Sequence, residues 1–130
     1  MKVNFATVLL DIEGDPFKIA KKGAQTDQYG NPLAKKDAED MTLGRAAKMA
    51  LTSPRKEPEK GEQYFDDTML AIKVAYGGEL ELTETEVTRI NERAALTWAT
   101  PEIPSRIRQL LKGEQQNTAK PPPATGENHE

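Results

Sequence analysis

Three acidic residues at alternate positions, Asp11, Glu13 and Asp15, have the types and spacing that could bind a metal ion. Alternating carboxylates are typical of the calcium-binding loop of EF-hand proteins. That loop needs glycine at its sixth position and glutamate at its twelfth, but this chain has Gly14 at the fourth and Lys22 at the twelfth. We therefore interpret these residues as a solvated acidic turn and predict no metal site.

A second acidic pair, Asp66 and Asp67, consists of neighbours in the sequence. Adjacent residues of a helix point about 100° apart, so the two carboxylates do not share a face. The pair is typical of an exposed helix surface near an N-terminus, where negative charge is favourable.

The residue types that most often act as nucleophiles, bases or soft metal ligands are almost absent. The chain has no cysteine, and its one histidine, His129, is the second-last residue of a polar C-terminal segment. A chain end of this kind does not hold a side chain within catalytic tolerance. The lysine–glycine pairs also lack the spacing of a phosphate-binding loop. We predict that the protein is not an enzyme and has no cofactor.

Two arginines near the C-terminal end could contact nucleic acid. Arg106 and Arg108 lie on a predicted helix over 101–112, joined tightly to the preceding helix at Thr100-Pro101. Glu102 opposes them at the end that would meet the bases. The net charge of −3 also gives no general attraction to phosphate. A small DNA-binding regulator that uses the 101–112 helix therefore remains the alternative function.

Two large aromatic residues are candidates for contacts with a partner protein. Tyr76 and Trp98 are the largest apolar side chains in the helical part of the sequence. Such residues most often belong to a core, but an exposed one is a natural anchor for a partner. The candidate partner-binding residues are Tyr76, Trp98, Arg106 and Arg108.

The N-terminal elements predict a β-hairpin. Residues 3–10 favour a strand, Gly14 and Pro16 favour a turn, and residues 17–19 suit a short return strand. Residues 20–40 carry many charges and have little to bury, so we expect a flexible insert. A repeat of the turn pattern at 27–33 leaves a second hairpin open.

Four helices are predicted after the insert. Thr42 is a candidate N-cap of a short helix ending near residue 51, in which Gly44 allows close approach of another helix. The capping box Thr83–Glu86 opens a later helix that continues to Trp98. The last is the 101–112 helix, with Thr100 as its expected cap.

The second of these helices, around residues 64–76, has the clearest apolar stripe. Phe65, Met69, Ile72 and Tyr76 follow the spacing of one helix face. Gly77-Gly78 predicts its end.

Together these elements predict an α+β fold in one small domain, residues 1–112. An N-terminal β-hairpin packs on a small bundle of three main α-helices plus one short helix. Residues 113–130 are polar and proline-rich, which predicts a disordered tail. No apolar run approaches the roughly 20 residues that span a bilayer, and no signal peptide is recognisable. We therefore expect no membrane contact and a cytoplasmic protein.

The order of these parts resembles small accessory proteins of tailed bacteriophages and prophages, many of which have no assigned role. The resemblance covers about residues 2–19 and 41–111. It depends on four short segments, at residues 2–5, 10–16, 41–46 and 82–90, on a charged insert before residue 41, and on an aromatic-bearing helix around residues 64–76. It implies no active site. It implies a bacterial host cell and a partner that is a phage structural protein or a host protein. We therefore expect a non-catalytic accessory protein that acts by protein–protein binding, as a particle-assembly factor or as a modulator or inhibitor of a host complex.

Overall fold

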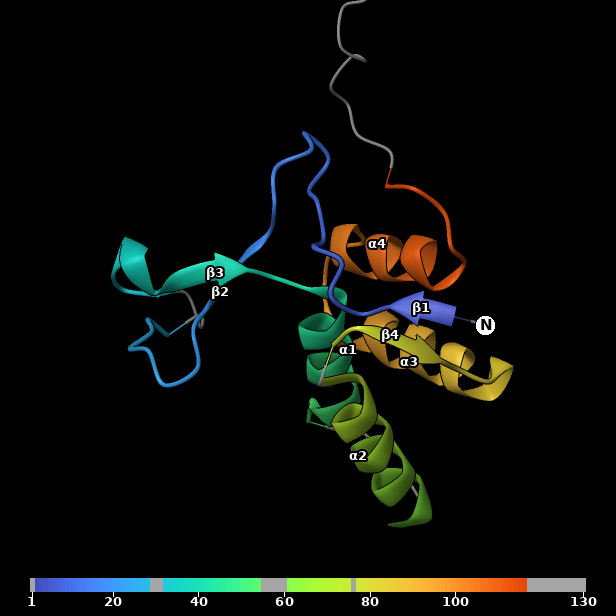
Figure 1. Ribbon diagram of the computed structural model, residues 1–130. Helices are drawn as coiled ribbons and strands as arrows, with labels where there is room; N and C mark the ends of the chain where they lie inside the picture. The colour runs from blue at the N-terminus through green and yellow to red at the C-terminus, as the bar shows by residue number, and fades with distance from the viewer. Residues whose placement is uncertain (1, 29–31, 55–60, 76, 117–130) are drawn as a thin grey trace, which may run out of the picture.

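The computed structural model describes residues 2–28, 32–54, 61–75 and 77–116 (Figure 1). Within them the chain has the predicted α+β fold, in which short antiparallel strand pairs accompany four α-helices. The elements in chain order are β1 (Lys2–Asn4), β2 (Lys18–Ala20), the 3-10 helix η1 (Lys35–Asp37), β3 (Ala38–Asp40), α1 (Leu43–Thr52), α2 (Gly61–Ala75), β4 (Glu79–Glu81), α3 (Glu84–Thr97) and α4 (Glu102–Leu111).

The predicted strand over 3–10 is divided between two pairings. Its first part, β1, pairs antiparallel with β4, with Val3 opposite Leu80. The chain then turns at Asn4, whose side-chain Oδ1 accepts a hydrogen bond from the Ala6 N–H at 3.0 Å. The hairpin turn itself forms as predicted further on, where the Phe17 N–H donates to the Leu9 carbonyl at 2.9 Å.

A second antiparallel pair, β2 with β3, brackets the predicted insert, and in it Ile19 lies opposite Glu39. Figure 1 shows this ribbon reaching away from the helices as an arm. Arg45 of α1 holds the two strands against that helix, because its guanidinium pairs with the Glu39 carboxylate and donates to the Ala20 carbonyl. At the repeated turn pattern, an isolated bridge joins Thr26 to Pro32, and residues 29–31 between them lie outside the described residues, so the second hairpin at 27–33 stays a prediction. The mobility of the insert stays a prediction.

Helix α1 is the centre of the fold and contacts α2, α3 and α4. Its alanines are buried, and the N-terminal segment adds Phe5 and Leu9 to the same core. The predicted close approach occurs at Gly44, where a Cβ atom would lie 2.7 Å from the Val74 carbonyl oxygen and 3.2 Å from that of Phe5. The absence of a side chain at Gly44 therefore lets α2 and the N-terminal segment pack directly on the α1 backbone.

Hydrogen-bonding side chains fix the beginnings of two helices as predicted. Thr42 Oγ1 accepts from the Arg45 N–H at the start of α1. Thr83 and Glu86 form the complete capping box of α3. The cap expected at Thr100 was wrong: Pro101 is the N-cap of α4 and makes no side-chain cap bond.

The chain beyond residue 112 begins with contacts to the N-terminal segment. The Gln116 side-chain amide donates to the Val8 carbonyl at 2.8 Å and accepts from the Leu10 N–H at 2.7 Å. The rest of the predicted tail, from residue 117, lies outside the described residues. In the part of the chain that the structure describes, no helix has the length and apolar character needed to cross a membrane.

Candidate functional site

Arg106, a predicted partner-binding residue, is buried and holds the backbone of the N-terminal turn. Its Nε donates to the Leu10 carbonyl at 2.8 Å and its Nη2 to the Asp11 carbonyl at 2.9 Å. Its Nη1 donates to the Gln109 side chain at 2.9 Å. The guanidinium is therefore engaged in hydrogen bonds within the molecule. The sequence could not decide between these roles, because a basic residue in an amphipathic helix can either bind a partner or hydrogen-bond within the fold.

Trp98 and Arg108 lie together at the junction of α3 and α4. Both line a shallow hollow of about 360 Å³. Trp98 is half-buried and packs against the core, whereas Arg108 is exposed. Tyr76, the fourth predicted residue, lies outside the described residues. The structure thus brings together two of the four predicted residues, and it separates Arg106 from them.

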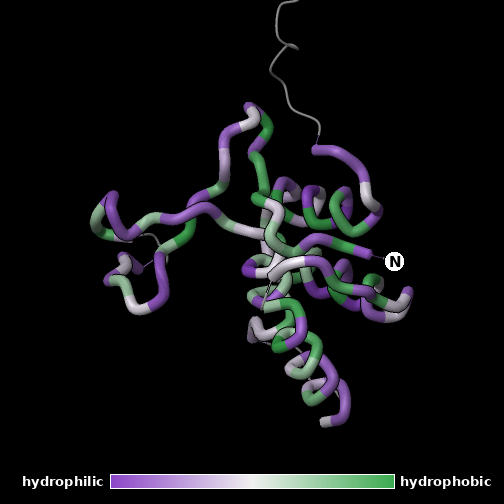
Figure 2. Tube along the Cα trace, in the orientation of Figure 1, coloured by the Kyte–Doolittle hydropathy of each residue, from purple (hydrophilic) through white to green (hydrophobic). Residues whose placement is uncertain are grey.

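The apolar stripe predicted on α2 lies on the outside of the molecule. Phe65 is 66% exposed, Met69 50% and Ile72 51%. We call these three residues the outer stripe. Figure 2 shows α2 extending from the fold with strongly hydrophobic positions along it. A contiguous apolar face of this kind on a surface helix marks a contact site more often than scattered apolar residues do.

The opposite face of α2 packs on the rest of the protein. Its buried residues, Asp67, Leu70, Ala71 and Val74, lie about 180° around the helix axis from the outer stripe. They have the i, i+3, i+4, i+7 spacing of a core-facing stripe. The helix therefore has two apolar faces, and the smaller side chains occupy the one that packs closely against α1.

Asp67 is buried against α3, so its interpretation as an exposed surface residue was wrong. It is only 1% exposed. Arg89 of α3 donates to both carboxylate oxygens, with Nε–Oδ1 at 2.9 Å and Nη2–Oδ2 at 2.8 Å. The Gln63 amide donates to Oδ1 at 3.0 Å. A two-point contact between guanidinium and carboxylate has the geometry of a strong ion pair and fixes α2 on α3.

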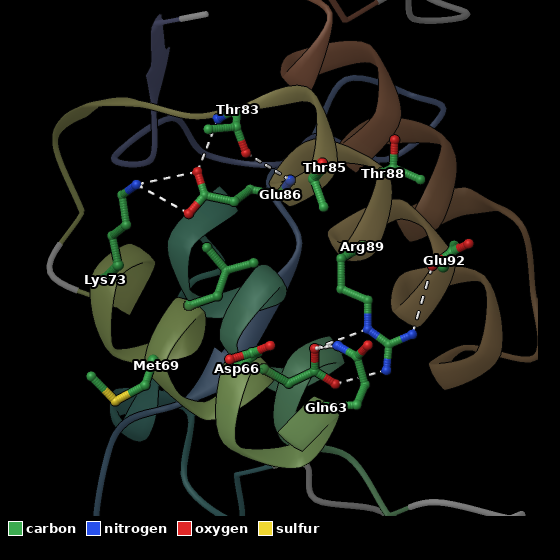
Figure 3. A pocket seen from close by; sticks show the side chains of 12 residues that line it. Gln63, Asp66, Met69, Lys73, Thr83, Thr85, Glu86, Thr88, Arg89 and Glu92 are labelled. Atoms are coloured by element: carbon green, nitrogen blue, oxygen red, sulfur yellow. Dashed lines mark hydrogen bonds and ion pairs between the residues drawn. The ribbon is translucent and has the colours of Figure 1, made fainter. Parts of the chain in front are cut away.

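An open groove of about 590 Å³ lies between α2 and α3, beside the outer stripe (Figure 3). Lys73 bridges it to Glu86, with Nζ–Oε2 at 3.2 Å. Asp66 also lines the groove, and Figure 3 draws no interaction from it to the neighbouring residues. Met69 is shared by the groove and the stripe.

The carboxylate of Glu86 is held in its charged form by its neighbours. Partial burial alone raises the pKa of Glu86, but hydrogen bonds from the Thr83 N–H and from Lys73 outweigh that effect. The pKa of Glu86 therefore lies below its ordinary value of 4.5. A carboxylate with this environment is suited to capping a helix and pairing with lysine rather than to accepting a proton near neutral pH.

The polar groups of the groove thus serve to join α2 and α3. Among the described residues, no cluster of three or more histidine or carboxylate side chains could hold a metal ion. The absence of enzyme activity and of a cofactor stays a prediction. No protein-family model, no curated protein and no solved structure matches the chain. The functional conclusion therefore rests on the surface that the fold presents.

Proposed function

We propose that the chain is a non-catalytic accessory protein that binds another protein through the outer stripe of α2. The observation that carries the proposal is the exposure of Phe65, Met69 and Ile72, each at half or more of its surface. Helices that bind other proteins commonly present anchors at i, i+4 and i+7, which is the spacing of these residues.

Burial of the outer stripe by a partner is energetically favourable. Complete burial of a phenylalanine, methionine or isoleucine side chain contributes about 1.5–3 kcal/mol. The opposite face of α2 is already fixed by the Asp67–Arg89 ion pair and by contacts with α1. The helix is therefore held in place before a partner arrives, which reduces the entropy lost on binding.

The resemblance to small phage accessory proteins is the reason we expect a phage structural protein or a host protein as the partner. The role is then that of a particle-assembly factor or of a modulator or inhibitor of a host complex, acting in the cytoplasm of a bacterial cell. The alternative of a DNA-binding regulator is less favoured. One of its two arginines, Arg106, donates its hydrogen bonds to Leu10, Asp11 and Gln109.

The proposal predicts that polar substitutions in the outer stripe abolish protein binding. The experiment is affinity capture from host lysate at low and high salt with nuclease treatment, comparing wild type with the double variant Phe65→Ser, Met69→Ser. We expect wild type to retain a protein at high salt after nuclease, because apolar contacts are insensitive to salt. The double variant is expected to retain at least about tenfold less.

The matched control is the double variant Ile12→Ser, Leu96→Ser, which removes two similarly exposed apolar side chains outside α2. It is expected to retain as much partner as wild type. Equal retention by the stripe variant and wild type would overturn the proposal. Recovery that disappears with nuclease or with modest salt would favour the DNA-binding alternative, since phosphate contacts weaken steeply as salt rises.

A further inference from the structure

We propose that the outer stripe binds a second copy of this chain, with α2 of one molecule antiparallel to α2 of the other about a two-fold axis. The inference deepens the proposed function and rests on it, because it names a partner for the same stripe. It is carried by two features of α2, the spacing of its exposed apolar residues and the arrangement of charges along one edge.

The apolar residues are arranged so that one register satisfies both copies. In a two-fold interface, if residue i contacts residue j of the second copy, then j also contacts i. Phe65 and Ile72 are seven residues apart, which is about two helical turns, and Met69 lies between them. Placing Phe65 against Ile72 of the second copy therefore creates that contact twice. The same register brings the two Met69 side chains together near the axis.

The charges beside the stripe fit the same register. Asp66 and Lys73 each follow a stripe residue by one position, and both lie on the edge that faces the groove. A two-fold axis perpendicular to antiparallel helices keeps this edge on one side of the pair. Asp66 of each molecule then lies near Lys73 of the other, forming two ion pairs. In a parallel pair the two-fold axis would run along the helices and place the two groove-facing edges on opposite sides, which separates Asp66 of each molecule from Lys73 of the other.

Both charged groups are available for this contact. Asp66 is exposed and forms no ion pair with the other described residues. Lys73 pairs with Glu86 at 3.2 Å, but its side chain is 39% exposed. Because an ammonium group has three donors, Lys73 can donate to a second carboxylate while it keeps its bond to Glu86.

The size of the surface predicts a weak dimer. Helix α2 has 15 residues and is about 22 Å long. One helix–helix contact of this length buries less than the roughly 800 Å² per partner of a standard interface. We therefore expect dimers that dissociate on dilution and that a tighter-binding partner displaces from the stripe.

Charge reversal tests the inference by sedimentation velocity of the full-length chain over a range of concentrations. The variants Asp66→Lys and Lys73→Glu each place two pairs of like charges in the interface. Each is expected to raise the dimer dissociation constant at least about tenfold. An equimolar mixture of the two variants restores opposite charges at both contacts and is expected to recover dimers. Glu13→Lys makes the same charge change in an exposed turn outside α2 and is expected to dimerise like wild type.

Thermal unfolding followed by circular dichroism confirms that each variant is folded, which matters for Lys73→Glu because it removes the bond to Glu86. The Asp66→Lys variant breaks no bond of the described residues, so its result stands even if the other variant unfolds.

A monomeric wild type, normal dimers of Asp66→Lys, or a mixture of folded variants that stays monomeric would each overturn the inference. A monomeric wild type whose captured partner is still lost with the Phe65→Ser, Met69→Ser variant overturns only the dimer. Dimerisation and capture that are both unaffected by that variant overturn the proposed function as well.

Discussion

Replacement of Asp67 by alanine is expected to lower the free energy of unfolding by about 3 kcal/mol. Removing one partner of a buried ion pair typically costs 3–5 kcal/mol, because the other charge stays behind without compensation. We expect the lower end of that range, since the Arg89 side chain is 19% exposed and also pairs with the Glu92 carboxylate at 3.6 Å. The loss is measured by urea denaturation followed by circular dichroism.

The neighbouring carboxylate provides the control for this prediction. Asp66→Ala removes an exposed aspartate from the same helix and is expected to change the unfolding free energy by no more than about 0.5 kcal/mol. The double variant Asp67→Leu, Arg89→Met replaces both charges by apolar groups and is expected to recover much of the lost stability. Equal effects of Asp67→Ala and Asp66→Ala would contradict the role assigned to the ion pair.

Replacement of Gly44 by alanine is expected to destabilise the protein by about 2 kcal/mol, although alanine favours helices. The helix preference alone would stabilise by about 0.5–1 kcal/mol. The new Cβ would lie 2.7 Å from the Val74 carbonyl oxygen and 3.2 Å from that of Phe5, and both atoms belong to the backbone. Separating packed groups to admit a methyl group costs about 1–3 kcal/mol. We expect the upper part of that range, because both atoms belong to the backbone and neither can rotate away.

A second glycine separates this steric effect from helix preference. Gly61→Ala adds the same methyl group at the first residue of α2, where none of the described residues outside its chain neighbours lies within 4 Å of it. It is expected to be neutral or slightly stabilising. The unfolding free energies of both glycine variants are measured by thermal and urea unfolding. If Gly44→Ala were as stable as Gly61→Ala, the direct packing of α2 and the N-terminal segment on α1 would be wrong.

Local signals explain why the helices could be predicted from the sequence. The threonine caps at Thr42 and Thr83 act on the N–H groups of residues within the next turn, so their effect is readable from a few residues. The close approach predicted at Gly44 was confirmed. Glycine is unfavourable within a helix, so its presence there indicates that another part of the chain packs against it. The strand pairing of β1 with β4 joins residues about eighty positions apart, and nothing in either short segment specifies the other.

The apolar face of α2 could be predicted from the sequence, but whether it faces the core or the solvent could not. The spacing of Phe65, Met69 and Ile72 predicts an apolar face on α2 and does not say whether a core or a partner covers it. The opposite face of α2 contains Asp67. A charged residue is not expected in a core, so the burial of this face could be recognised only once Arg89 of α3 was known to pair with Asp67. The contacts of Arg106 could not be read from the sequence for a similar reason, since two of its acceptors are backbone carbonyls that have no sequence signature.

The measurement that tests protein binding by the outer stripe most directly is site-specific photo-crosslinking in living host cells. A benzophenone-bearing phenylalanine analogue replaces Ile72 in one variant and Leu96, an exposed residue of α3, in the other. We predict a protein adduct from position 72, either with a second copy of the chain or with a larger partner, and none from position 96. No adduct from position 72, or equal adducts from both positions, would contradict the central claim that the outer face of α2 is a protein-binding surface.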